Sequence, residues 1–309
     1  ASGTKYYPEG IIEEWSKKDP VDNFEAFLMS QGVLSESEVN DQREEYRELI
    51  ARELDVAYSE PAIVPDRKKE LGDMYAPHEA TVVSASTGTK EMRFIDAIQD
   101  GLRESMKKHP ELILMGQDIA DYGGVFKVTE GFTEEFGKHR VRNTPLCESA
   151  IIGTGLGLSI KGKKAMVEMQ FADFVTCGFN QIVNNLAKIH YRWGQNADVV
   201  LRMPTGAGVA AGPFHSQSNE AWFFHTPGLK IFYPAFPEDA KGMMTAAFED
   251  PNPVIFFEHK ALYRSITADV PEGYYTSEIG KAAIRKSGES LSIITYGMGV
   301  HWALEAAER

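Results

Sequence analysis

The sequence predicts an α/β protein whose main domain is built on a mainly parallel sheet covered by helices. Short apolar runs alternate with segments of helical length from residue 91 onward, which is the order typical of parallel sheets. These runs are apolar at nearly every position, as strands buried on both faces are. Since ligands of such sheets bind beyond the carboxyl ends of the strands, we expect site residues to follow the strands.

The first 60 residues are acidic and are predicted to be helical. Ser35 and Glu38 have the spacing of a capping box, which predicts a helix that begins there and carries Val39 and Leu49. Residues 61–90 contain three prolines and a Ser/Thr/Gly cluster without apolar periodicity. That composition predicts a linker.

The main domain is predicted to extend over residues 91–270. An amphipathic helix begins near Phe94 and continues through Ile98 and Leu102. Residues 271–309 contain a further strand–turn–helix pattern, whose strand begins at Glu289, so we expect the start of a second α/β domain that is cut short at Arg309. The strands predicted in the main domain are 111–116, 164–171, 198–204, 229–235 and 253–259, and the helices that follow the first one are 178–193, 219–225 and 237–249.

Charge and composition exclude several classes of partner. The net charge of −13 argues against a surface for nucleic acid or anionic membrane. No apolar run has the length of a membrane span, and no segment resembling a signal peptide opens the chain. Cys147 and Cys177 form no CxxC or Cys/His cluster, so neither a disulfide framework nor structural zinc is indicated. We expect no nucleic-acid and no membrane partner.

Three closely spaced glycines, Gly153, Gly155 and Gly157, allow two interpretations. They resemble a dinucleotide-binding turn, with Glu168 at the end of the next strand as a ribose ligand. Their spacing is GxGxG rather than GxGxxG, however, and polar residues separate them from any preceding strand. The pattern therefore favours a helix whose small face packs closely against a neighbour.

Two further segments place polar or aromatic side chains after predicted strands. The glycine-rich loop 204–218 delivers His215 just before a helix, either as a catalytic proton donor or as an incidental surface histidine. Gln170 and Phe174 follow another strand, where an aromatic is ordinarily core and sometimes a platform for a planar ring. Glu148 precedes the small-residue helix and is either a functional carboxylate or a helix-capping residue.

Longer motifs add a family resemblance. Residues 143–174, which include "NTPLCE" and "QFADF", together with 212–231 and 237–264, closely resemble one family. It is the beta subunit of the thiamine-diphosphate-dependent, decarboxylating first component of 2-oxoacid dehydrogenase complexes. The two quoted motifs are most similar to the branched-chain (2-oxoisovalerate) form. Residues 19–60 resemble the C-terminal tail of the alpha subunit of the same family.

The resemblance implies a domain order and a division of the cofactor site. It identifies 1–60 as an alpha-subunit tail, 61–90 as a linker, 91–270 as a transketolase-like pyrimidine-binding domain and 271–309 as the start of a transketolase C-terminal-like domain. The family's Gly-Asp-Gly…Asn motif, which binds Mg²⁺ and the diphosphate of the cofactor, does not occur here. The ligands of Mg²⁺ are therefore expected in an alpha-like region outside this sequence.

The resemblance also assigns roles to single residues. Glu148 matches the catalytic glutamate that hydrogen-bonds N1′ of the aminopyrimidine of thiamine diphosphate, and Phe174 matches the aromatic residue that stacks on this ring. Leu146 and Gln170 match neighbours in the same pocket. His215 matches the catalytic histidine implicated in acyl transfer to lipoamide. Asp250 and Asn252 resemble a site for a monovalent cation such as K⁺, and otherwise they form a turn.

The function implied is oxidative decarboxylation of branched-chain 2-oxoacids, with transfer of the acyl group to the lipoyl group of dihydrolipoamide transacylase. Pyruvate dehydrogenase is the alternative within the family. A nicotinamide-dependent oxidoreductase and a non-catalytic assembly module are the alternatives outside it. The expected partners are the lipoyl-bearing transacylase, a second copy of the chain and a small 2-oxoacid. The expected location is the cytoplasm of a bacterium or the mitochondrial matrix of a eukaryote.

Overall fold

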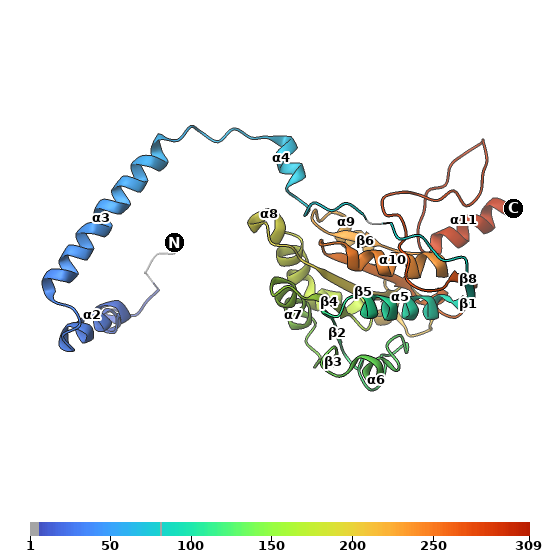
Figure 1. Ribbon diagram of the computed structural model, residues 1–309, viewed down its shortest axis with the longest axis horizontal. Helices are drawn as coiled ribbons and strands as arrows, with labels where there is room; N and C mark the ends of the chain where they lie inside the picture. Colours follow the sequence, from blue (N-terminus) through green and yellow to red (C-terminus); the bar gives the residue numbers. More distant parts are fainter. Residues whose placement is uncertain (1–5, 81) are drawn as a thin grey trace. The chain divides into compact units, whose positions relative to one another are not determined.

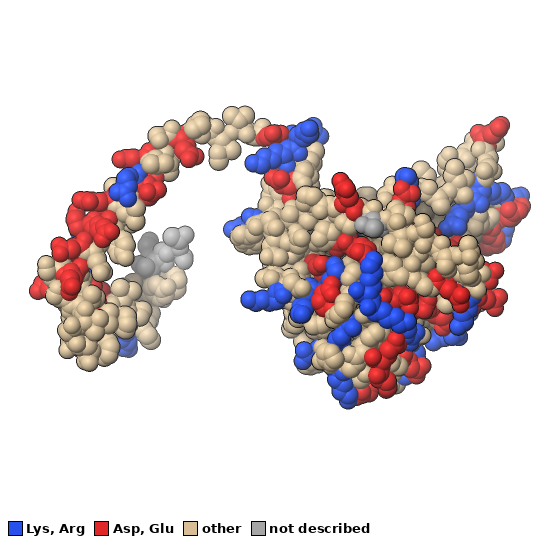
Figure 2. All heavy atoms as spheres, in the orientation of Figure 1, with Lys and Arg blue, Asp and Glu red and all other residues tan. Residues whose placement is uncertain are grey.

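The computed structural model describes residues 6–80 and 82–309, which fall into two compact units divided after Pro65. The first unit is helical, as predicted, with α1 (Ile11–Ser16), α2 (Pro20–Ser30) and α3 (Glu36–Ser59). The capping box is confirmed, because Ser35 Oγ accepts from Glu38 N at 3.3 Å and Glu38 Oε2 accepts from Ser35 N at 2.8 Å. Acidic side chains gather along α3 (Figure 2).

The second unit contains a six-stranded sheet in the order β3-β2-β4-β5-β7-β6 (Figure 1). Every pairing in it is parallel, which confirms the predicted sheet type. A separate antiparallel pair joins β1 (Thr89–Arg93) to β8 (Thr267–Pro271). The strands of the main sheet are β2 (Leu112–Gly116), β3 (Val141–Asn143), β4 (Lys164–Glu168), β5 (Val199–Thr205), β6 (Lys230–Phe232) and β7 (Val254–His259).

Helices cover both faces of this sheet. Successive side chains of a strand point to opposite faces, and alternate residues of the central strands belong to two different core clusters. One cluster includes α5 (Phe94–Lys108) and α10 (Pro237–Glu249), which pack against each other (Figure 1). The other includes α7 (Glu148–Ile160) and the irregular helical segment after β4. The remaining helices of this unit are α4 (Arg67–Gly72), α6 (Phe132–Phe136), α9 (Glu220–Phe224) and α11 (Met298–Glu308).

The segment 178–193, which is predicted to be one helix, is helical but changes from one helix type to another. It starts earlier, as the 3₁₀ helix η1 (Ala172–Gly178), widens into the π-helix η2 (Gln181–Leu186) and ends as α8 (Ile189–Trp193). The amide of Ala187 donates to the carbonyl of Ile182 at 2.9 Å, the wider bonding pattern of a π turn. Such turns depend on tertiary packing, so the apolar spacing alone does not reveal them.

The strand predicted near 289–296 is absent from the described structure. Residues 291–296 are irregular, and the side chain of Ile294 is 94% exposed. A strand requires a neighbour for its backbone hydrogen bonds, and the described part of the chain pairs no strand with this segment. The helix predicted after it is present as α11.

Part of the predicted linker packs on the main domain. The amide of Ala76 donates to Asn252 Oδ1 at 2.7 Å, and Val83 N donates to Thr276 Oγ1 at 2.8 Å. The predicted linker also includes the short helix α4. The domain limits 1–60, 61–90, 91–270 and 271–309 stay a prediction.

The three clustered glycines lie inside α7 rather than in a turn before it. A Cβ atom at Gly155 would lie 2.9 Å from Val167 Cγ1 on β4, whereas a Cβ atom at Gly157 would meet nothing within 4 Å. The helix therefore approaches the sheet more closely than a side chain at Gly155 allows. This confirms the interpretation of a small helix face that packs on a neighbour.

We predict that Gly155→Val lowers the free energy of unfolding by about 1–3 kcal/mol, because the added atoms overpack the contact with Val167. Gly157→Val is the matched control on the same helix, and its effect should stay within about 0.5 kcal/mol. Urea unfolding of both variants measures the difference. Equal effects at the two positions would contradict the close approach.

Candidate functional site

The carboxyl edge of the parallel sheet collects polar side chains from several strands. Gln117 follows β2, Glu148 follows β3 at the start of α7, and Gln170 follows β4. His215 lies in the long loop after β5, and Lys260 follows β7 directly. Because these strands are parallel, the segments that follow them leave the same edge, where ligands of such sheets bind.

Glu148 is half-buried and is held by a hydrogen bond from across the sheet edge. Gln117 Nε2 donates to Glu148 Oε1 at 3.0 Å. The N-cap position of α7 is Cys147, whose side chain makes no capping bond. The carboxylate of Glu148 therefore faces Gln117 and not the first backbone amides of its own helix. This placement favours a functional carboxylate over a capping residue.

The segment after β2 also connects Glu148 to Gln170. Gln170 Nε2 donates to Asp118 Oδ2 at 3.3 Å and approaches the carbonyl of Gln117 at 3.5 Å. Asp118 has a φ of 59°, a backbone conformation that costs free energy in residues other than glycine and often marks functional sites. Glu148 and Gln170 thus share one polar network through two consecutive residues.

An open hollow of about 660 Å³ lies beside Glu148. Of the seven residues predicted for the site, all of them in the described part of the chain, only Glu148 lines this hollow. Leu146, two residues earlier, is 80% exposed. The lining residues are Cys147, Glu148, Ser149, Ala150, Gly153, Thr154, Cys177 and Gln181.

His215 packs among aromatic rings. Its ring centroid lies 4.6 Å from that of Phe171 and 5.4 Å from that of Phe174, edge to face in both cases. Phe171 and Phe174 also contact each other, at 5.7 Å. The structure therefore brings together the predicted ring platform and the predicted proton donor, although the residues lie about forty positions apart in the sequence.

Asp250 and Asn252 lie just before β7, at the opposite edge of the sheet. Asp250 Oδ1 accepts from Asn252 Nδ2 at 2.8 Å, and its other oxygen pairs with Lys230. Both polar atoms of the Asn252 amide also bond the backbone of Ala76. Arranged in this way, the two side chains hold an ammonium group and a backbone segment. The monovalent cation stays a prediction.

A buried ionic cluster, which the sequence patterns did not predict, lies under the carboxyl edge. Arg202 on β5 donates through Nε and Nη2 to the two carboxylate oxygens of Glu258 on β7, at 2.5 and 2.6 Å. Its Nη1 pairs with Glu168 on β4, and Tyr263 donates to Glu258 Oε2 at 2.7 Å. All four side chains are at most 4% exposed. The sequence feature that could have predicted this cluster is the single charged residue near the middle or end of each of three apolar strands, Glu168, Arg202 and Glu258.

This cluster explains why the apolar strand β4 ends with the charged residue Glu168, which pairs with Arg202. Burial raises the pKa of the Glu168 carboxyl, and the charge of Arg202 opposes that rise. The carboxylate is engaged inside the protein, and the glycines that precede it in the sequence lie within a helix. Neither part of the dinucleotide motif is placed to bind a nucleotide.

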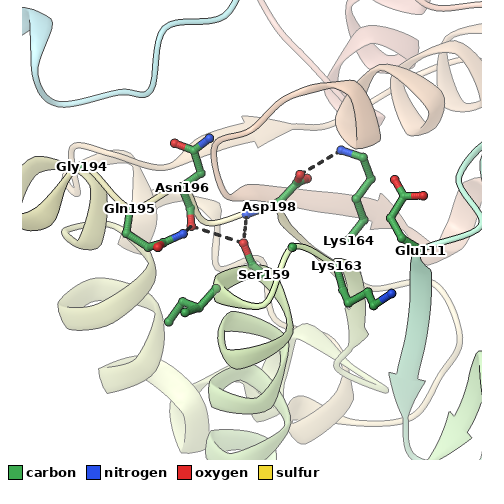
Figure 3. Close-up of a pocket in the computed structure, with 10 residues that line it drawn as sticks. Glu111, Ser159, Lys163, Lys164, Gly194, Gln195, Asn196 and Asp198 are labelled. Carbon is green, nitrogen blue, oxygen red and sulfur yellow. Dashed lines mark hydrogen bonds and ion pairs between the residues drawn. The ribbon is translucent and has the colours of Figure 1, made fainter.

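A second hollow, of about 430 Å³, lies at the amino edge of the sheet (Figure 3). Several of its polar groups bond one another: Lys164 pairs with Asp198 at 2.9 Å, and Ser159 Oγ accepts from Asp198 N at 2.7 Å. Burial raises the pKa of Asp198, and Lys164 opposes that rise. Because ligands of parallel sheets bind at the other edge, we assign no site here.

Comparisons with known proteins agree with this geometry. Residues 90–266 match the family model described as "Transketolase, pyrimidine binding domain", and residues 2–66 match "Dehydrogenase E1 component". The chain belongs to the transketolase pyrimidine-binding-domain family. The predicted resemblance and the predicted fold class are confirmed, as is membership of an enzyme family, the E1 components of 2-oxoacid dehydrogenases.

Sequence relatives include two kinds of beta subunit. The 2-oxoisovalerate dehydrogenase subunit beta of Bacillus subtilis (strain 168) is 47% identical over 71% of this chain and 67% of its own length. The mitochondrial 2-oxoisovalerate dehydrogenase subunit beta 2 of Arabidopsis thaliana is 41% identical over 71% of this chain and 62% of its own. The pyruvate dehydrogenase E1 component subunit beta of B. subtilis is 42% identical over 71% of this chain and 68% of its own length. The chain thus spans about two thirds of these relatives.

A solved structure supports the fold alone. The inactive beta4 tetramer of a split-gene transketolase superposes with a TM-score of 0.56 at 23% identity, over 70% of this chain and 67% of that one. No helix in the described residues is long and apolar enough to cross a membrane.

We predict that Arg202→Met lowers the free energy of unfolding by about 3–5 kcal/mol, because it leaves two buried carboxylates without their counter-charge. Arg103→Met is the matched control, since Arg103 pairs with Glu135 near the surface. Its loss should cost about 1 kcal/mol or less. Chemical unfolding of both variants measures the difference, and a small loss for Arg202→Met would contradict the importance of the cluster.

Proposed function

We propose that this chain supplies the pyrimidine-binding half of a thiamine-diphosphate-dependent 2-oxoacid dehydrogenase. The observation that carries the proposal is the half-buried carboxylate of Glu148 at the carboxyl edge, tied through Gln117 to Gln170. The reaction proposed is oxidative decarboxylation of a branched-chain 2-oxoacid, followed by transfer of the acyl group to the lipoyl group of a transacylase. The B. subtilis 2-oxoisovalerate relative, 47% identical against 42% for its pyruvate counterpart, favours the branched-chain substrate.

The residues at this edge fit an aminopyrimidine ring. Glu148 offers a carboxylate beside an open hollow, and Phe174, in the segment that follows β4, offers a half-buried aromatic face. Gln117 Oε1 is buried without a hydrogen-bond partner among the described residues, so it is available to a ligand that donates. A ring that carries an amino group and basic nitrogens matches this set of one carboxylate, one acceptor and one aromatic platform.

In the proposed mechanism Glu148 holds and exchanges a proton at N1′ of the pyrimidine. Gln117 orients the carboxylate through its bond to Oε1, and Phe174 orients the ring by stacking. Thiamine diphosphate, when bound, supplies the electron sink for the loss of CO₂. The ligands of Mg²⁺ and of the diphosphate would come from the alpha-like component. Leu146 is proposed to contact the cofactor when that component covers its exposed side chain.

His215 is proposed to serve the transfer half-reaction. An imidazole donates and recovers a proton near neutral pH, as the opening of a lipoyl disulfide requires. The ring packs against Phe171 and Phe174 at the end of a glycine-rich loop, where we propose that the lipoyl group is received. We further propose that the chain works in a homo-oligomeric assembly with the transacylase, in a bacterial cytoplasm or a mitochondrial matrix.

We predict that Glu148→Gln, in the assembled enzyme, retains the fold but loses decarboxylation by at least about a hundredfold. An amide preserves the shape and the bond to Gln117 but cannot exchange a proton with N1′, and general acid–base contributions are typically about 10²–10⁴-fold. Turnover with an artificial electron acceptor and thermal unfolding are measured on the same preparation.

Glu134→Gln, an exposed change on α6, is the control and should leave both measurements unaltered. Normal turnover in well-folded Glu148→Gln would contradict the catalytic role and would favour the assembly module.

We predict that His215→Ala, in the assembled enzyme, leaves substantial decarboxylation with an artificial acceptor but reduces acylation of an added lipoyl domain by about 10²–10⁴-fold. Decarboxylation needs the cofactor's electron sink, whereas acyl transfer also needs a proton delivered to the departing sulfur. Exposed His225→Ala is the control and should preserve both rates. Equal losses in the two assays would place His215 in decarboxylation or substrate binding.

A further inference from the structure

Lys260 carries a buried ammonium group that the proposed reaction does not use. Its side chain is 3% exposed, and Nζ has no hydrogen-bond partner among the described residues. Burial lowers the pKa of Lys260 to about 8, and the charge of Asp173 opposes that fall. A buried cation is costly unless a nearby anion compensates it. Asp173 is the anion that interacts with this one.

Asp173 lies in η1 and is itself 6% exposed. Its Oδ1 accepts from the backbone amides of Ser216 and Gln217, at 3.0 and 3.1 Å. These are the two residues that directly follow His215. Its Oδ2 is buried and has no hydrogen-bond partner in the described structure. One carboxylate oxygen therefore binds the histidine loop. The other makes no hydrogen bond among the described residues, and the charge of the carboxylate interacts with the charge of Lys260.

A second contact leads from Lys260 to the same histidine. Lys260 Nζ lies 5.5 Å from the centroid of the Phe171 ring, within the range of a cation–π interaction. The Phe171 ring in turn packs against the His215 ring at 4.6 Å. Lys260 thus interacts with both of the groups that hold His215, with Asp173 through its charge and with Phe171 through a cation–π contact.

The loop needs such anchors because its backbone is permissive. Gly206, Gly208 and Gly212 have positive φ angles, and so does Ala210. A segment of this kind has many accessible conformations and fixes no ring by itself. Hydrogen bonds to an ionised carboxylate are about twice as strong as neutral ones. The two hydrogen bonds that the Asp173 carboxylate accepts therefore hold the end of the loop.

We infer that Lys260 is a positioning residue for His215, acting through the carboxylate of Asp173 and the ring of Phe171. The inference rests on the proposed function only in the role it gives His215. It predicts that removing the ammonium group loosens the histidine ring while the rest of the site stays intact.

The test compares Lys260→Met with Lys281→Met, which removes an exposed lysine from a surface ion pair. Histidine ring resonances of ¹³C-labelled chain are recorded, and His215→Ala identifies the signal of His215. Lys260→Met should move that signal toward its random-coil position, because the ring leaves the shielding of Phe171, and Lys281→Met should leave it in place. In the assembled enzyme, the ratio of lipoyl acylation to decarboxylation should fall by about tenfold or more.

The double variant Lys260→Met/Asp173→Asn tests the coupling of the two charges. Lys260→Met alone leaves a buried carboxylate without compensation, so adding Asp173→Asn should recover part of the lost thermal stability. If Lys260→Met does not fold but the double variant does, that result would also support the coupling between the charges of Lys260 and Asp173.

Three outcomes would overturn the inference. They are an unchanged His215 resonance in folded Lys260→Met, additive stability losses in the double variant, and failure of both variants to fold. A His215 resonance that moves without any change in acyl transfer would leave the positioning role standing and would contradict the proposed role of His215 instead.

Discussion

The ion pairs of Arg202 are the interaction on which the geometry of the candidate site depends. Arg202 bonds Glu168 on one neighbouring strand and Glu258 on the other, with all three side chains buried. Glu168 lies two residues before Gln170, and Glu258 lies two residues before Lys260. Because breaking a buried pair leaves an uncompensated charge, this cluster opposes any slip of the three strands. It therefore fixes the positions, along the strand direction, of Gln170 and Lys260, which follow two of these strands.

The aromatic residues extend this scaffold toward the histidine loop. Tyr263, which donates to Glu258, packs against Phe126 at 5.1 Å, and Phe126 packs against Phe171 at 5.4 Å. Phe171 then contacts His215. A continuous series of buried and half-buried rings thus joins the rigid centre of the sheet to a loop rich in glycine. On the other side of the edge, Glu148 is positioned by a helix that lies close to the sheet because Gly155 carries no side chain.

The sequence predicted those features whose signal is local. Continuous apolar runs predicted the parallel strands, Ser35 and Glu38 predicted a capping box, and the motif around Glu148 predicted the family. The ionic cluster was not predicted, because a single charge within each strand shows no partner until the register of the strands is known. The register pairs Glu168 with Arg202. The contacts of Asp173 with the loop were hidden for a similar reason, since they join residues more than forty positions apart. Neither the π turn near Ala187 nor the irregular segment that replaces the strand near 289–296 has a local signature.

We propose that the carboxyl edge of this sheet receives the aminopyrimidine of thiamine diphosphate. A crystal structure of the assembled enzyme with thiamine diphosphate and Mg²⁺ tests it most directly. We expect N1′ within about 2.6–3.2 Å of a Glu148 carboxylate oxygen, with the ring stacked on Phe174 and Gln170 beside it. A pyrimidine ring bound away from Glu148, for example at the hollow beside Lys164 and Asp198, would contradict this placement.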